Sequence, residues 1–336
     1  MDDVQLMHAL AEVIGDQVGS DVIVQRIIPL AGGASRETSA VELSIQSGPE
    51  AGDYELVMRR DLRSEIQPDA LDRKAEFNLL MAAYEAGIMV PQPRWYGEIE
   101  RPMFLMDRVV GESIGSRIVG LSELKQARTE LPQQMGRQLA KIHALEGEFE
   151  DLPSPSPEGN SAQHTIRRVR KMADEIGIQN PAYEFAFRWL EARAPTPKAI
   201  TLVHGDYRIG NVIVDSQGLL AIVDWEFAHL GDPTEDLAWP CVRDWRFGKD
   251  ALSFGGVGSR ADFLAAYEEG GGLPFDTEAV DYWEILGNVR WAVGCQSQAQ
   301  RHLSGEDPGV ELASLGRRAA EMELEFLRLI EATEED

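Results

Sequence analysis

The sequence predicts an α+β fold in two parts, a small antiparallel-sheet part over residues 1–110 and a larger, mostly helical part over residues 111–336. Three observations support this prediction. Apolar residues alternate along short runs in about the first hundred positions, as they do in half-buried strands. Apolar residues then recur at helical spacing over most of the remainder. One further pair of apolar runs, joined by a tight turn, predicts a β-hairpin inside the helical part.

The composition is typical of a soluble globular protein with a substantial core, at 43% hydrophobic and 26% charged residues. No run of about 18 uncharged apolar residues occurs, so a membrane span is not expected. The N-terminus is acidic and lacks the basic start of a signal peptide. The two cysteines, Cys241 and Cys295, are too few for a disulfide framework. We therefore expect a cytoplasmic protein.

The formal net charge is −25, with 57 Asp and Glu residues against 32 Lys and Arg residues. Binding to nucleic acid depends on neutralising phosphates with basic side chains, so no nucleic-acid partner is expected. An acidic surface also repels anionic membranes and mildly favours cationic small molecules. The oligomeric state stays open between monomer and homodimer.

The first part begins with a helical pattern around Leu6, Leu10 and Ile14. A β-like run over 22–30 and a turn-rich break over 31–38 follow. Two further alternating runs, over 39–45 and 54–60, complete an antiparallel meander.

A main helix is predicted over 69–86, where Gly87 supplies the stop signal. The segment 91–113 then returns to strand. Its second strand is predicted to start at Met103 and to run through Val110, ending at Gly111.

In the second part, a Pro- and Ser-rich loop is predicted over 151–163 and strands over 199–204 and 211–225. In the rest of this part, apolar residues recur at helical spacing. The predicted helices cover 131–145, 165–176, 182–194, a segment from Arg260, a segment from Thr277, and 311–332.

The stretch "LVHGDYRIGNVIVD" places charged and hydrogen-bonding residues between two apolar runs. Folding the hairpin over 211–225 brings Asn211 roughly opposite Asp224, with Cβ atoms about 5 Å apart. Asp206 lies five residues before Asn211, in the turn that leads into the hairpin. These three side chains are therefore expected to converge, and an amide oxygen with a carboxylate can share a divalent cation.

Three interpretations compete for this cluster: a turn that is merely polar, a metal-dependent hydrolytic centre, or a phosphoryl-transfer loop. Phosphoryl transfer needs a carboxylate that accepts the proton of the attacking hydroxyl, together with oxygen ligands that hold Mg²⁺ on the phosphates. Because Mg²⁺ takes few protein ligands besides substrate phosphate, the sparse set here fits it.

Two motifs carry a resemblance to a known family. "HGDYRIGN" matches the pattern His-x-Asp-x-x-x-x-Asn, and "IVDWE" takes the place of the kinase Asp-Phe-Gly. With "VDWEFAHLGDPTEDLAW", the sequence resembles the aminoglycoside phosphotransferase, or choline-kinase-like, branch of the protein-kinase-like fold. "WEILGNVRWAVGCQSQAQRHLSG" further resembles the kinase-like domain attached to some acyl-CoA dehydrogenases and its stand-alone bacterial relatives. The resemblance extends from about Ile27 to Leu329 and implies a bilobal fold.

The resemblance assigns roles to the residues of both motifs. It implies that Asp206 is the catalytic base and that Asn211 and Asp224 are Mg²⁺ ligands. Arg208 stands where many protein kinases have a lysine that touches the transferred phosphate, although a solvated or structural arginine is an equal alternative. His204 is expected to be a buried brace, and Asp236 a structural carboxylate that ties a helix to the catalytic loop.

The resemblance also implies a nucleotide site in the first part. Arg59 occupies the position of the usual nucleotide-binding lysine, with Arg60 adjacent, and Glu76 is its helix partner. Backbone groups near Met106 and Asp107 would meet adenine. The phosphate loop would lie in "LAGGASRET", at Gly33, Ala34 and Ser35.

The implied activity is an ATP- and Mg²⁺-dependent transfer of phosphate to a hydroxyl of a small molecule, such as a hydroxyacyl thioester. An aminoglycoside-type antibiotic kinase and a catalytically silent nucleotide-binding regulatory module are the alternatives. The stretch "NVRWAVGCQSQAQRH" is either part of a packed core helix or a site for an anionic or acyl substrate. Four of its residues stand at near-helical spacing: Arg290, Trp291, Arg301 and His302.

Overall fold

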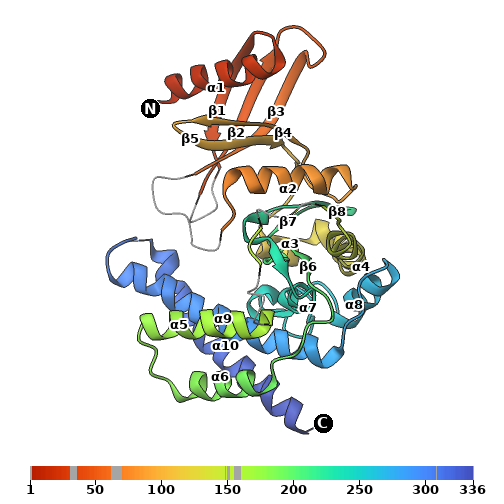
Figure 1. The fold of residues 1–336 in the computed structure, drawn as a ribbon, viewed down its shortest axis with the longest axis vertical. Helices are drawn as coiled ribbons and strands as arrows, with labels where there is room; N and C mark the ends of the chain where they lie inside the picture. Colours follow the sequence, from red (N-terminus) through yellow and green to blue (C-terminus); the bar gives the residue numbers. More distant parts are fainter. Residues whose placement is uncertain are drawn as a thin grey trace. The chain divides into compact units, whose positions relative to one another are not determined.

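The computed structural model (Figure 1) describes residues 2–30, 36–61, 70–147, 149, 152–154, 160–307 and 309–335. The chain divides into two compact units. The first unit consists of Met1–Gly111, Gly147–Leu152 and Leu220–Ala228. The second consists of Glu112–Glu146, Pro153–Leu219 and His229–Asp336.

The first unit is built on a five-stranded antiparallel sheet in the order β1-β2-β3-β5-β4. The predicted meander of the first three strands is confirmed. The strands are β1 (Val22–Pro29), β2 (Arg36–Ile45), β3 (Gly52–Asp61), β4 (Pro93–Ile99) and β5 (Arg101–Asp107).

The predicted end of β5 is wrong, because the strand stops at Asp107 and not at Val110. The last pair of the β4–β5 ladder is Pro93 with Met106. Proline has no N–H to continue a ladder. The next residue, Arg108, donates its N–H to Glu55 at 3.0 Å, and the chain then leaves the sheet.

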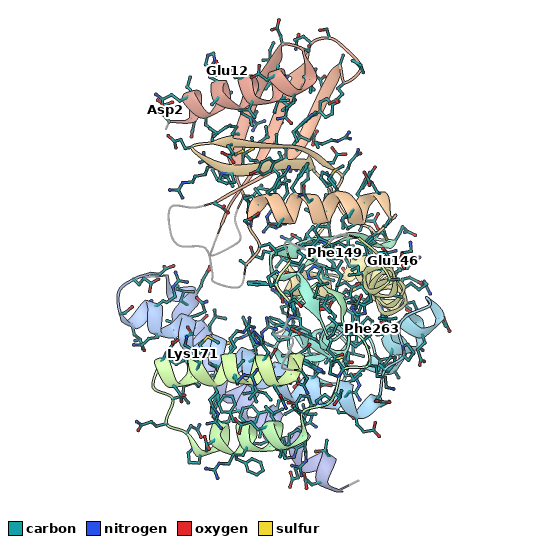
Figure 2. The ribbon with its side chains drawn as sticks, in the orientation of Figure 1. Asp2, Glu12, Glu146, Phe149, Lys171 and Phe263 are labelled. Atoms are coloured by element: carbon teal, nitrogen blue, oxygen red, sulfur yellow. The ribbon has the colours of Figure 1, made fainter. Side chains whose placement is uncertain are left out.

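Helix α1 (Asp3–Val18) covers one face of the sheet. Asp2 lies at its start (Figure 2) and accepts a hydrogen bond from Gln5 N at 2.9 Å, which satisfies a free helix donor. The core under α1 is apolar throughout and is formed by Leu6, Leu10, Ile14, Val41, Leu43, Leu56, Met58, Trp95, Met103 and Leu105, among others.

Helix α2 (Arg73–Glu85) packs against the other face, as the alternation along β5 requires. Met103 and Leu105 belong to the core beneath α1, whereas Phe104 between them packs on Phe77 of α2 with ring centroids 5.9 Å apart. Successive side chains of a strand point to opposite faces, so one strand contributes to both layers.

The second unit is mostly helical, as predicted. Its helices are α3 (Gly115–Gly120), α4 (Lys125–His143), α5 (Ser161–Glu175), α6 (Pro181–Arg193), α7 (Thr234–Ala238), α8 (Arg260–Glu269), α9 (Thr277–Leu303) and α10 (Val310–Glu335). Short 3-10 turns η3 (Trp239–Cys241) and η4 (Arg243–Arg246) follow α7. None of the described helices has the length and apolar character that a membrane span needs.

Two short sheets accompany these helices. Strand β6 (Thr201–Val203) pairs with β9 (His229–Gly231), which the sequence patterns did not predict. The predicted hairpin is present as β7 (Val212–Asp215) and β8 (Gly218–Ile222). The loop between β6 and β7 turns at Gly205 and Gly210, whose φ angles of 77° and 108° favour glycine.

Candidate active site

Asp206 lies in the loop between β6 and β7, and its carboxylate accepts hydrogen bonds from three side chains. Oδ1 accepts from Trp239 Nε1 at 2.6 Å and from Arg208 Nε at 3.0 Å. Oδ2 accepts from Asn211 Nδ2 at 2.6 Å. A carboxylate offers about four acceptor sites, so these bonds orient Asp206 and leave capacity for a substrate hydroxyl.

Asn211 is almost completely buried, with 4% of its surface exposed. Its Nδ2 also donates to the backbone oxygen of Asp206 at 3.0 Å. Because both amide hydrogens point at Asp206, the amide oxygen is directed elsewhere and can act as a ligand for a cation. Residues five positions apart in the motif therefore hydrogen-bond to each other across the loop.

Asp236 of α7 stabilises this loop by accepting hydrogen bonds from its backbone. Its two carboxylate oxygens accept the backbone N–H groups of His204 at 2.6 Å and Gly205 at 3.0 Å. His143 of α4 contacts the same carboxylate at 3.3 Å, and Tyr267 of α8 contacts His143 Nδ1 at 2.8 Å. Burial alone would raise the pKa of Asp236, but these donors and the nearby imidazoles hold that pKa below its usual value.

His204 is fully buried, and its Nδ1 accepts the backbone N–H of Asp206 at 3.3 Å. The first residue of the motif therefore supports the loop from inside. This arrangement agrees with the bracing roles predicted for His204 and Asp236.

In the first unit, Arg59 of β3 is shared among three carboxylates. Its Nη2 lies 2.9 Å from Asp224 Oδ1 and 3.3 Å from Glu226 Oε2, and its Nε lies 3.5 Å from Glu76 Oε1. Burial would lower the pKa of the guanidinium, but Glu76, Asp224 and Glu226 together raise it. Arg59 is therefore a permanent cation, and the predicted partner Glu76 is in contact with it.

Glu76 has a second cationic neighbour, because Arg73 Nη1 forms an ion pair with Glu76 Oε2. Arg73 is itself fully buried, and its Nε lies 3.0 Å from Asp61 Oδ1. Two arginines thus hold Glu76, which explains how α2 can bury this carboxylate against the sheet.

Asp224 precedes the 3-10 turn η2 (Trp225–Phe227) and has a left-handed backbone, with φ 70° and ψ 55°. Such a conformation costs free energy for any residue with a side chain, although Asp tolerates it better than most. About 35% of its side chain is exposed, so the carboxylate held by Arg59 is still accessible.

Met106 and Asp107 lie at the end of β5. The N–H of Asp107 donates to Gln92 O at 2.9 Å, and its carboxylate forms a fork with Arg94, in which both contacts measure 2.7 Å. Met106 is buried opposite Val57 of β3. Their contact with adenine stays a prediction.

For the other predicted site residues, the structure gives only part of the predicted arrangement. Gly33, Ala34 and Ser35 lie outside the described residues. Asn211 belongs to the second unit and Asp224 to the first, so their convergence on one cation stays a prediction.

Trp239 and Trp245 are site residues that the sequence patterns missed. Trp239 bonds directly to Asp206, and the Arg208 guanidinium lies 4.1 Å from the centre of the Trp245 ring. The available signal was the density of tryptophan just after the second motif, in "LAWPCVRDWRFG". Because both tryptophans lie more than 30 residues after Asp206, the sequence patterns did not predict that they contact its loop.

The four residues predicted for an anionic or acyl substrate all lie in α9, but they separate into two groups. Arg290 lies 4.6 Å from the centre of the Trp239 ring and 3.1 Å from Glu235, and Trp291 Nε1 donates to Asp244 at 2.6 Å. Arg301, near the end of α9, pairs instead with Glu306 at 2.9 Å. Only the first two lie near the tryptophans around Asp206. His302 follows Arg301 in the last turn of α9.

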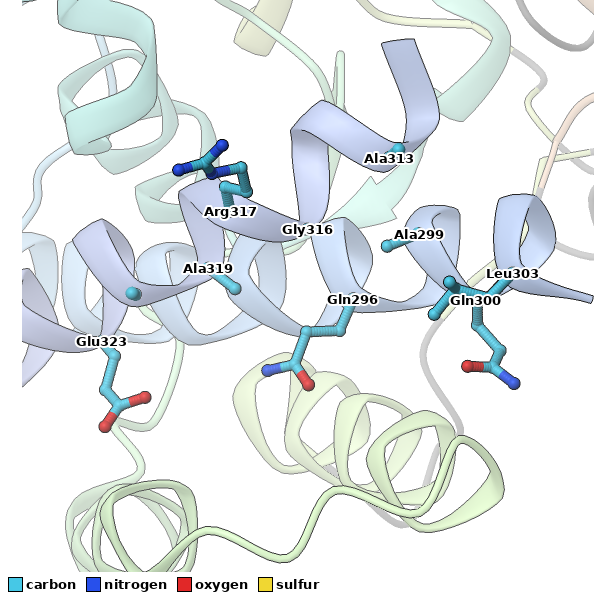
Figure 3. Close-up of a pocket in the computed structure, with 10 residues that line it drawn as sticks. Gln296, Ala299, Gln300, Leu303, Ala313, Gly316, Arg317, Ala319 and Glu323 are labelled. Carbon is cyan, nitrogen blue, oxygen red and sulfur yellow. The ribbon is translucent and has the colours of Figure 1, made fainter. Parts of the chain in front are cut away.

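A separate cavity of about 490 Å³ lies between α9 and α10 (Figure 3). Small residues such as Ala299 and Gly316 line it together with the polar side chains of Gln296, Gln300 and Glu323. None of the residues predicted for catalysis, nucleotide or metal lines this cavity, so we do not assign it to the active site.

Similar folds occur in solved structures of phosphotransferases. An aminoglycoside phosphotransferase candidate from Ralstonia eutropha has a TM-score of 0.71 at 23% identity, covering 96% of this chain and 98% of that one. Spectinomycin phosphotransferase in complex with ADP and spectinomycin has a TM-score of 0.61 at 13% identity, covering 95% and 98%. At these identities the likeness shows the fold, and the predicted protein-kinase-like fold is confirmed.

Among curated proteins, the acyl-CoA dehydrogenase family member 10 of Mus musculus is 30% identical over 200 residues, which is 56% of this chain. The chain spans only 18% of that protein, and less than two fifths of the family member 11 relatives that follow it.

Residues 26–283 match the model of the phosphotransferase enzyme family, known as APH. This match includes both sequence motifs and the loop around Asp206, and it covers well over half of the chain. The predicted resemblance is confirmed: this chain belongs to the phosphotransferase enzyme family.

Proposed function

We propose that this protein transfers the γ-phosphate of ATP to a hydroxyl group of a small molecule, with Asp206 as the catalytic base and Mg²⁺ as cofactor. The observation that carries the proposal is the carboxylate of Asp206, which Trp239, Arg208 and Asn211 orient together. Membership of the phosphotransferase family supplies the reaction class. The ADP bound to spectinomycin phosphotransferase supports a nucleotide as the phosphate donor.

In this proposal residues 1–110 bind the nucleotide and residues 111–336 carry the catalytic loop and the acceptor site. Gly33, Ala34 and Ser35 would approach the phosphates, and Met106 with Asp107 the adenine. The buried pair of Arg59 and Glu76 supports this assignment, because it sets a fixed cation beside Asp224.

Asp206 accepts the proton of the acceptor hydroxyl while the hydroxyl oxygen forms a bond to the γ-phosphorus. The bond between that phosphorus and the β,γ-bridging oxygen breaks, and ADP leaves with the electron pair. Arg208, bonded to the same carboxylate, places a guanidinium where it can stabilise the transferred charge. Most of the rate enhancement comes from positioning, because the phosphoryl group needs little covalent assistance.

Asn211 and Asp224 are the proposed ligands of Mg²⁺, which when bound would neutralise charge on the phosphates. Among the described residues, no group of three or more His, Cys, Asp or Glu side chains could hold a metal ion. Mg²⁺ takes one or two carboxylates and completes its shell with substrate phosphate and water. The amide oxygen of Asn211 suits such a sparse site, because the amide nitrogen and not the oxygen contacts Asp206.

The acceptor that we propose is a metabolic hydroxy compound such as a hydroxyacyl thioester, and the similarity to acyl-CoA dehydrogenase family member 10 supports this class. An aminoglycoside is the second candidate, supported by the likeness to spectinomycin phosphotransferase. We further propose a cytoplasmic location, since Cys241 and Cys295 are both free and buried.

Replacing Asp206 with Asn keeps the shape of the site but removes the base. We expect Asp206→Asn to lower kcat by about 10²–10⁴-fold, the usual contribution of general base catalysis. ADP release and transfer of labelled phosphate would be followed over a panel of hydroxy compounds, with mass spectrometry of a labelled metabolite extract to find the acceptor. Asp174→Asn, an exposed site on α5, is the matched control.

The alternatives give different results in the same experiment. A metal-dependent hydrolase would act without nucleotide, and a silent regulatory module would bind nucleotide without turnover. ATP with Mg²⁺ at about 100 times Kd should stabilise the fold by about 2.7 kcal/mol, measurable as a rise in Tm. If wild type never exceeds Asp206→Asn with any acceptor, the proposed activity is wrong.

A further inference from the structure

Three tryptophans and two arginines gather around Asp206 in the second unit, and we name them the indole–guanidinium cluster: Trp239, Trp245, Trp291, Arg208 and Arg290. The Trp239 and Trp245 ring centroids are 5.5 Å apart, and those of Trp245 and Trp291 are 4.7 Å apart. Trp239 bonds to Asp206, so the cluster is continuous with the catalytic carboxylate.

One face of each of two rings is already covered by a guanidinium group of the chain itself. Arg208 lies 4.1 Å from the Trp245 centroid, and Arg290 lies 4.6 Å from the Trp239 centroid. Open indole faces attract ammonium groups. Here an ammonium of an acceptor would compete with a guanidinium that already contacts the Trp239 or the Trp245 ring, so the cluster opposes cationic acceptors.

The carboxylates around the cluster are also paired. Asp244 accepts from Trp291 Nε1 at 2.6 Å and lies 2.6 Å from Arg318. Glu235 lies 3.1 Å from Arg290. An amino group of an acceptor would compete with these existing partners. The acidic net charge of the whole chain therefore does not extend to this site.

One hydrogen-bond donor of the cluster lacks a partner. Trp245 is 5% exposed, and its indole N–H has no hydrogen-bond partner among the described residues. The other two indoles each donate to a carboxylate, Trp239 to Asp206 and Trp291 to Asp244. A buried donor without an acceptor is costly, and an oxygen atom from a ligand would satisfy it.

We propose that the phosphate acceptor presents an anionic oxygen group, a carboxylate or a phosphate, to Arg208 and to the N–H of Trp245. The same acceptor places its hydroxyl at Asp206. Because Arg208 Nε lies 3.0 Å from Asp206 Oδ1, the two groups of the acceptor are only a few bonds apart. This inference rests on the proposed function. It favours a short hydroxy compound with an anionic oxygen group over the hydroxyacyl thioester named above, because the thioester group is uncharged.

The indole N–H signal of Trp245 in a ¹H–¹⁵N spectrum tests the binding step without turnover. The protein has seven tryptophans, and loss of one signal in Trp245→Phe assigns it. Hydroxy acids and hydroxyalkyl phosphates of increasing length should shift this signal downfield, whereas matched hydroxy amides and choline should not. The two anionic series distinguish carboxylate from phosphate. Equal shifts with amines, or no shift with either anion, would overturn the inference.

Kinetics give the second measurement. Trp245→Phe keeps an aromatic ring but removes the N–H, so KM for an anionic acceptor should rise about ten-fold more than KM for its neutral analogue. Trp189→Phe is the matched control, since its indole donates to Glu334 on α10. Turnover of neutral or cationic acceptors alone, with Trp245→Phe equal to wild type, refutes the inference and leaves the phosphotransferase proposal intact. Absence of any turnover refutes that proposal, and the spectral titration still decides the inference.

Discussion

Arg59 has the position that a lysine usually holds in this family, and the structure shows what an arginine adds there. Its planar fork reaches Glu76 with one nitrogen and both Asp224 and Glu226 with another. A lysine ammonium is a single point charge and cannot offer this fixed geometry. Arg59 therefore orients Asp224, the proposed metal ligand.

Removal of this cation should destabilise the first unit. Arg59→Ala leaves Glu76, Asp224 and Glu226 without their shared partner, and we expect a loss of about 3–5 kcal/mol in the free energy of unfolding. Arg26→Ala is the control, because Arg26 is exposed and lies 3.6 Å from Glu42, an arrangement worth about 0–1 kcal/mol. Urea denaturation measures both. Equal losses in the two variants would contradict a structural role for the Arg59 contacts.

Among the elements, α7 is short but connects the loop between β6 and β7 to helix α4. Asp236 joins the loop backbone at His204 and Gly205 to His143 of α4. Because these donors favour the ionised carboxylate, its pKa in the folded state lies below its value in the unfolded chain. Its contribution to stability is complete above the unfolded pKa and is lost as pH falls through the folded pKa.

Asp236→Asn should therefore change the pH dependence of stability. We expect the variant to be less stable than wild type at pH 7, and to lose less stability than wild type between about pH 5 and pH 2. Denaturation by urea over this pH range checks the prediction, with Asp174→Asn on the exposed side of α5 as the reference. If the free energy of unfolding of the variant fell with pH as steeply as that of wild type, protonation of Asp236 would not explain the loss of stability in acid.

For the whole molecule, the excess of 57 acidic over 32 basic residues produces repulsion that the fold must overcome. Raising NaCl from about 0.01 M to about 0.1 M shortens the screening length from about 30 Å to about 10 Å. We expect Tm to rise by about 1–2 °C, equivalent to roughly 1 kcal/mol for a chain of this size.

Scanning calorimetry measures this effect. Potassium chloride should act like sodium chloride, because screening does not depend on the identity of the cation. Sucrose at equal osmolality serves as the uncharged reference. A constant or falling Tm with added salt would mean that attractive surface pairs outweigh the net repulsion.

Several features followed from the sequence by itself, because each depends on neighbours along the chain. Alternation and helical spacing of apolar residues located most strands and helices, including the sheet that β1, β2 and β3 form. The spacing of "HGDYRIGN" brought Asn211 to Asp206, since five residues with glycines at two turns can close one loop. Periodicity and turn chemistry are local properties, and a sequence displays them directly.

The tertiary structure decided the features that depend on distant segments. It paired β6 with β9, ended β5 opposite Pro93, and brought Trp239 to Asp206 from another element. Such contacts depend on which faces of packed helices and turns meet, and no local pattern of residues encodes that choice. The acceptor chemistry inferred for this protein belongs to this second group, because tertiary packing assembled the indole–guanidinium cluster around the loop that carries Asp206.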